Sequence, residues 1–65
     1  PELFHKLLIA AFAHRRKTLK NNLIPLIGRP KIEQLELSCN IELNRRAETL
    51  NEAEFIYLSD LIATL

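Results

Sequence analysis

Several classes of protein are excluded by what this 65-residue sequence lacks. A single Cys cannot form an internal disulfide, and a single Gly leaves almost no room for tight or phosphate-binding loops. The longest apolar run, residues 7–13, is too short to span a bilayer, and no secretory segment opens the chain. The chain also has no Met, which indicates a piece of a larger polypeptide or a processed product.

What is present predicts one small ordered domain. Hydrophobic residues make up 48% of the chain and charged residues 26%, so the composition is not that of a disordered segment. A chain of this length buries only about 60% of its unfolded surface, so its core must be efficient. It seldom builds a catalytic pocket unaided. No segment has the pattern of a strand, and the expected fold class is all-α, a small bundle of about four short helices.

The expected helices follow the apolar periodicity and the positions of Pro, Gly and Asn. They are residues 2–13 with Pro1 at the first helical position, residues 17–24 with Pro25 as an end or kink and Gly28 as a stop, residues 31–38, and a last helix after Asn51. Asn51 and Glu54 have the spacing of a capping box. The segment 39–50 is expected to be irregular.

Charge is divided along the chain. Residues 1–31 carry seven Lys or Arg side chains and one carboxylate, a net charge of +6. Residues 32–65 carry two Lys or Arg side chains and seven carboxylates, a net charge of −5. Either the basic half is an electrostatic footprint for phosphate, or the two halves attract each other on folding.

A basic run between the first two helices is the main functional signal. It reads Arg15-Arg16-Lys17-Thr18-Leu19-Lys20-Asn21-Asn22-Leu23. Because Arg15 would lie in an apolar stripe of either helix, we expect a break near residues 14–17, where three adjacent cations could reach one ligand. Arg and Lys donors suit phosphate. The candidate RNA-binding residues are Arg15, Arg16, Lys17, Lys20 and Asn21. At least one of Asn21 and Asn22 is expected to be structural, and a solvated basic face or a localisation-type tract is the alternative reading of the run.

Other chemistry has little support. His5, His14 and Cys39 do not have the spacing of a zinc site, and no catalytic or metal site is expected. There is no GxGxxG, P-loop or GxSxG motif. The Phe residues lie on apolar stripes and Tyr57 is the single Tyr, so no stacking platform for single strands is expected. Arg46 and Glu48 are assigned to an internal ion pair or a tie within the loop.

The basic run resembles a known family. Residues 12–23 are similar to the AF-x-x-RRKTL-R/K-NNL stretch that opens the C-terminal domain of small-subunit ribosomal RNA adenine dimethyltransferases of the KsgA type. Residues 46–50 together with Glu54, Phe55 and Leu58 resemble the RAE-x-L…EF…L ending of that family. The similarity extends over residues 3–61, nearly the whole chain.

The resemblance implies an excised C-terminal domain that helps the enzyme dock on small-subunit rRNA or the pre-ribosomal small subunit. The full-length enzymes use S-adenosylmethionine to dimethylate two adjacent adenines near the 3′ end of that rRNA, in the cytoplasm. Their catalytic methyltransferase domain belongs to the same polypeptide and is absent from these residues, so this chain alone is expected to hold no cofactor, to be inactive and to have no membrane partner. A helix-turn-helix DNA-binding domain and a protein-docking helical module are the alternatives.

Overall fold

The computed structural model describes residues 2–65, which form four α-helices and one short 3₁₀ helix, with no strand among them. The elements are α1 (Glu2–Ala11), α2 (Leu19–Ile27), α3 (Arg29–Ser38), the 3₁₀ helix η1 (Ala47–Thr49) and α4 (Glu52–Ala63). The predicted all-α bundle is confirmed.

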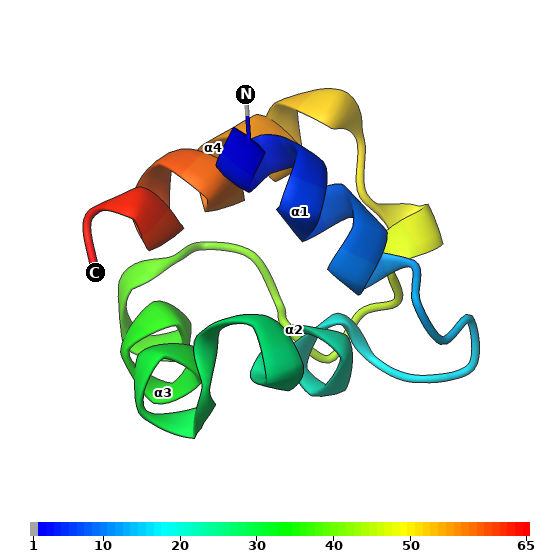
Figure 1. Cartoon of the computed structure of the whole chain (residues 1–65), viewed down its shortest axis with the longest axis horizontal. Helices are drawn as coiled ribbons and strands as arrows, with labels where there is room; N and C mark the ends of the chain where they lie inside the picture. Colours follow the sequence, from blue (N-terminus) through cyan, green and yellow to red (C-terminus); the bar gives the residue numbers. More distant parts are fainter. Residues whose placement is uncertain (1) are drawn as a thin grey trace.

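The helices form two layers (Figure 1). Helix α1 packs on α4 in one layer, and α2 and α3 form the other; α1 also contacts α2, and α3 contacts α4. Fully buried leucines fill the space between the layers: Leu7, Leu19, Leu23, Leu35 and Leu58. Burying one such side chain stabilises the fold by about 1.5–3 kcal/mol. None of the helices in residues 2–65 is long and apolar enough to cross a membrane.

Helix α1 ends at Ala11, two residues earlier than the periodicity predicts. The chain leaves the helix through a tightened turn, in which the Phe12 N–H donates to the Leu8 carbonyl and the Ala13 N–H donates to the Ala10 carbonyl. The expectation for Pro1 falls outside the described residues.

The sequence predicts that Pro25 either ends or kinks the second helix; α2 continues through Pro25 to Ile27, so the alternative that it ends there is wrong. Proline removes the hydrogen bond to the carbonyl four residues earlier, which belongs to Asn21. Both Pro25 and Asn21 lie on the exposed side of the helix, where water can satisfy that carbonyl. Gly28 stops the helix as predicted, with a positive φ of 85° that favours glycine, and α3 begins directly after it.

Helix α4 begins as the sequence predicts. The Asn51 side chain accepts from the Glu54 N–H at 2.8 Å, and the Glu54 carboxylate accepts from the Asn51 N–H at 3.0 Å. The capping box is therefore complete.

Candidate nucleic-acid interface

The chain between α1 and α2 folds into a tight turn that carries the predicted cations. The Lys17 N–H donates to the His14 carbonyl at 3.1 Å, which places Arg15 and Arg16 at the tip. We call residues 14–17 the basic turn. All of its residues are exposed, and it projects beyond the helices as the cyan loop in Figure 1. The predicted break between the first two helices is confirmed.

The buried side-chain amide of Asn22 stabilises the basic turn through hydrogen bonds to the backbone at its start. Asn22 is only 3% exposed, and its Nδ2 donates to the carbonyls of Ala11 at 2.8 Å and His14 at 3.0 Å. These two bonds join the end of α1 to the first residue of the turn. At the other end, the Thr18 hydroxyl accepts from the Asn21 N–H at 3.2 Å and begins α2. The expected structural amide is therefore Asn22, whereas Asn21 is exposed.

The segment between α3 and α4 docks beside the basic turn. The N–H groups of Leu19 and Lys20, in the first turn of α2, donate to the carbonyls of Arg45 at 2.8 Å and Leu43 at 2.9 Å. Such groups have no partner within their own helix. Leu43 is itself buried, so both its side chain and its backbone anchor the segment. This docking brings Arg46 to the basic turn.

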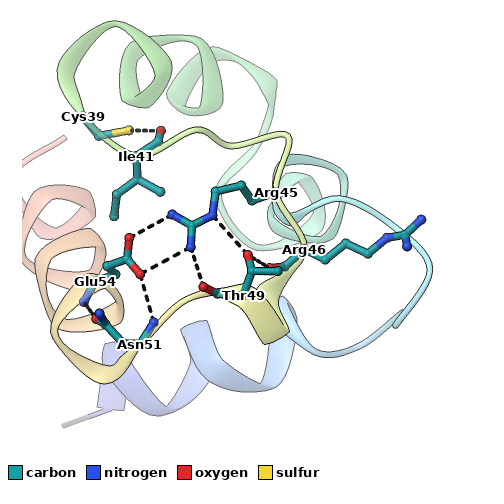
Figure 2. A network of polar contacts seen from close by, with 7 residues as sticks. All are labelled: Cys39, Ile41, Arg45, Arg46, Thr49, Asn51 and Glu54. Atoms are coloured by element: carbon teal, nitrogen blue, oxygen red, sulfur yellow. Dashed lines mark hydrogen bonds and ion pairs between the residues drawn. The ribbon is translucent and has the colours of Figure 1, made fainter.

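Arg45 and Arg46 point in opposite directions (Figure 2). The Arg45 guanidinium lies 2.9 Å from the Glu54 carboxylate, and it also donates to the Thr49 hydroxyl at 3.1 Å and to the Thr49 carbonyl. The Arg46 side chain extends away from this network and is exposed. The internal tie is therefore made by Arg45 with Glu54, and the prediction that Arg46 and Glu48 make it is wrong.

The hydrogen bonds around Glu54 connect parts of the fold, and they also lower the pKa of the Glu54 carboxyl group. The hydrogen bond from Arg45, followed by the backbone hydrogen bond from Asn51, holds the pKa of the Glu54 carboxyl below its ordinary value of 4.5. Because these donors favour the ionised form, the carboxylate stays charged at neutral pH. The Arg45 guanidinium is therefore engaged by Glu54 and Thr49 within the domain.

Arg46 and the basic turn share an open hollow of about 680 Å³. Its lining consists of Ala13, His14, Arg15, Arg16, Lys17, Arg46 and Glu48. In residues 2–65, none of the ion pairs involves one of its four cations. Four cations around one hollow, with a single carboxylate among them, form a surface that attracts polyanions.

The other two predicted RNA-binding residues are placed differently. The Lys20 ammonium lies 3.2 Å from the Glu36 carboxylate of α3 and does not line the hollow. Asn21 is exposed on the next position of α2 and does not line the hollow either. The structure therefore brings Arg15, Arg16 and Lys17 together. Sequence reasoning missed Arg46 as their neighbour, because an irregular segment has no periodicity that tells which of two adjacent arginines faces out.

Ion pairs between the basic residues 1–31 and the acidic residues 32–65 contribute little to holding the described chain together. Of the ion pairs in the described chain, Lys20–Glu36 joins the two halves, whereas Lys6–Glu2 and Arg45–Glu54 each lie within one half. The cations of the basic turn are in none of these ion pairs.

No group of three His, Cys, Asp or Glu side chains within residues 2–65 could hold a metal ion. Cys39 is half-buried against the core, and its thiol donates to the Ile41 carbonyl at 3.3 Å (Figure 2).

Similarity to known proteins covers nearly the whole chain. The ribosomal RNA small subunit methyltransferase A of Geobacillus thermodenitrificans is 44% identical over 69 residues, which is 98% of this chain. Proteins of the same name from Saccharophagus degradans and Clostridioides difficile are 44% identical over 95% of the chain and 38% identical over 97%. The chain belongs to this methyltransferase family.

The match spans 24%, 22% and 22% of the lengths of these three ribosomal RNA small subunit methyltransferases A, so the chain has about a quarter of their length. That coverage agrees with the expectation of a C-terminal domain alone. No protein-family model and no solved structure matches the chain.

Proposed function

We propose that this chain is the rRNA-gripping C-terminal domain of an S-adenosylmethionine-dependent enzyme that dimethylates two adjacent adenines near the 3′ end of small-subunit rRNA in the cytoplasm. The catalytic methyltransferase domain belongs to the same polypeptide. The observation that carries the proposal is the basic turn: three exposed cations, outside every ion pair of residues 2–65, on a backbone fixed at both ends. The names of the relatives supply the substrate class.

The geometry of the turn suits the RNA backbone. Arg guanidinium groups present planar forks of donors that match phosphate, and Lys adds a point charge. Phosphate contacts fix register and orientation without reading sequence, and RNA helices are recognised mainly by shape, phosphates and 2′-hydroxyls. A methyltransferase that acts on a base must flip that base out of its stack at a cost of a few kcal/mol. A separate domain that grips nearby RNA positions the target for this step.

The residues of this chain do not fit a site for S-adenosylmethionine. Its single glycine, Gly28, joins α2 to α3 and does not open a glycine-rich loop against a cavity. The contribution of this chain is therefore to bind the RNA.

Two features disfavour a helix-turn-helix that reads DNA. One residue, Gly28, separates α2 from α3, whereas such motifs use a turn of about three or four residues. Helix α3 carries the exposed carboxylates Glu33 and Glu36 beside the exposed cations Arg29 and Lys31, so it has no net positive charge with which to hold a phosphate backbone.

A salt titration with a structured RNA hairpin tests the proposal. We expect the slope of log K against log salt to be about −2 to −4, since three or four phosphates are engaged. Replacing Arg15, Arg16 and Lys17 with Ala should flatten this slope and leave the circular dichroism spectrum unchanged. The matched control replaces three other exposed cations, Lys6, Arg29 and Lys31, with Ala.

The control removes the same number of positive charges from α1 and α3, outside the basic turn, so it separates local binding from a general attraction. The proposal fails if both triple variants weaken binding equally, or if the basic-turn variant binds as the parent does. Stronger binding to a DNA duplex than to the RNA hairpin would favour the DNA-binding alternative. Binding to neither nucleic acid would favour the protein-docking alternative.

A further inference from the structure

A second, smaller hollow adjoins the first at the basic turn: the two share His14, Arg15, Lys17 and Glu48, and the second adds Ala11, Phe12 and Ala47. Its volume is about 320 Å³, at the lower end of the range of about 300–1,000 Å³ for small-molecule sites. Its lining is more apolar and consists of Ala11, Phe12, His14, Arg15, Lys17, Ala47 and Glu48.

Phe12 supplies an aromatic surface to this hollow. Its side chain is 48% exposed, so it is not the buried stripe residue that the sequence predicts. Its ring lies 5.8 Å from the ring of Phe55, which is buried in α4, at an interplanar angle of 39°. A half-exposed ring that contacts a buried ring can stack with a planar ligand.

The rest of the lining divides into an apolar part and a charged part. Ala11 and Ala47 are buried and small, so they leave room for a flat group. Arg15 and Lys17 are exposed and belong to the basic turn. Glu48 is a carboxylate, which accepts hydrogen bonds and donates none while it is ionised.

We propose that this hollow binds one unpaired nucleobase of the RNA, stacked on Phe12, and that it favours a base with an exocyclic amine. The inference rests on the proposed function. Unstacked bases are held in proteins by aromatic side chains, and the phosphates that flank such a base would meet Arg15 and Lys17. An amine donates to Glu48, whereas a carbonyl at the same place does not. The domain then recognises an unpaired base in a bulge or loop of the rRNA, in addition to the shape of an RNA helix.

Two RNA hairpins that differ at one position test the inference with the 65-residue chain. One carries a single bulged adenosine, and the other carries an abasic nucleotide at the bulge. We expect the chain to bind the adenosine hairpin about tenfold more tightly, within the range measured for stacking one base on an aromatic side chain. Phe12→Leu, which keeps an apolar side chain and removes the ring, should abolish this difference.

Phe4→Leu is the matched control. Phe4 is a half-buried phenylalanine of α1, the helix that ends directly before Phe12, and it lines a different hollow with Ile56 and Asp60. This variant should keep the tenfold preference, which separates a stacking contact from a general loosening of α1. Thermal unfolding of both variants shows whether each is folded at the temperature of the binding assay.

A third hairpin examines Glu48. Purine riboside lacks the exocyclic amine of adenosine and carries no other donor in its place, so a bulged purine riboside should bind more weakly than adenosine to the parent chain. The two should bind equally to Glu48→Ala. Equal binding to the parent would overturn the preference for an amine.

The outcomes separate this inference from the proposed function. If the chain binds the adenosine and abasic hairpins equally, while the basic-turn triple variant loses both, the hollow takes no base and the phosphate grip stands. A preference for adenosine that persists in Phe12→Leu would also overturn the inference. If the parent binds no hairpin, both fail.

Discussion

The two long connections of this domain are built in opposite ways. Between α1 and α2, residues 12–18 hold their shape through backbone hydrogen bonds and the amide of Asn22, and their side chains remain largely exposed. Between α3 and α4, residues 39–51 also use backbone hydrogen bonds, but they add the buried side chain of Leu43 and the guanidinium of Arg45. A connection that does not use its own side chains for stability leaves them available for a ligand.

Substitution within each connection should have very different effects on stability. Leu43→Ala removes a fully packed side chain and should lower the free energy of unfolding by about 2–5 kcal/mol. Arg16→Ala removes an exposed side chain at the tip of the basic turn and should change it by no more than about 0.5 kcal/mol. Urea denaturation of both variants measures the difference. Similar losses in the two variants would mean that the connections do not differ as described.

The support beneath the basic turn gives the next largest effect. Asn22→Ala removes both donors to the carbonyls of Ala11 and His14. The Oδ1 of Asn22 is buried without a partner in residues 2–65, which reduces what the side chain contributes, so we expect a loss of about 1–2 kcal/mol in the free energy of unfolding. RNA binding should weaken as well, although every cation is still present.

The neighbouring amide is the control for that variant. Asn21→Ala changes an exposed side chain of the same type and should alter the free energy of unfolding by no more than about 0.5 kcal/mol. If Asn22→Ala binds the RNA hairpin as tightly as Asn21→Ala does, the turn keeps its shape without the buried amide.

The smallest effect is the pH dependence of the second connection. The pKa of Glu54 is lowered in the folded chain, chiefly by the hydrogen bond from Arg45, so its contribution to stability is present above the unfolded value of about 4.5. That contribution is lost as the pH falls through the folded value. Glu54→Gln cannot titrate, so its urea midpoint should fall less than that of the parent between pH 7 and pH 3. Parallel decreases would show that this carboxylate contributes no acid sensitivity.

The features that local chemistry decides were predictable from the sequence. The capping box of Asn51 and Glu54 needs only two side chains three residues apart, and it is present. The break at residues 14–17 follows from the cost of placing Arg15 in an apolar stripe, and it is also present. Both predictions depend on neighbours along the chain.

The features that distant contacts decide were not predictable. Helix α2 continues through Pro25 because Pro25 and Asn21 both face solvent, and the packing of α2 in the whole fold decides which of its sides is exposed. Arg45 faces inward and Arg46 outward because the backbone around residue 45 is bonded to the start of α2. Phe12 is half exposed because α1 ends before it. No local sequence pattern predicts any of these three features.

The one-residue link at Gly28 has a consequence for the order of folding. A loop of one residue loses little chain entropy when it closes, so α2 and α3 can meet early and at low cost. The contact between α1 and α4 joins opposite ends of the chain and has to close a much longer loop. We expect α2, Gly28 and α3 to form the folding nucleus, and the return of α4 to α1 to limit the refolding rate.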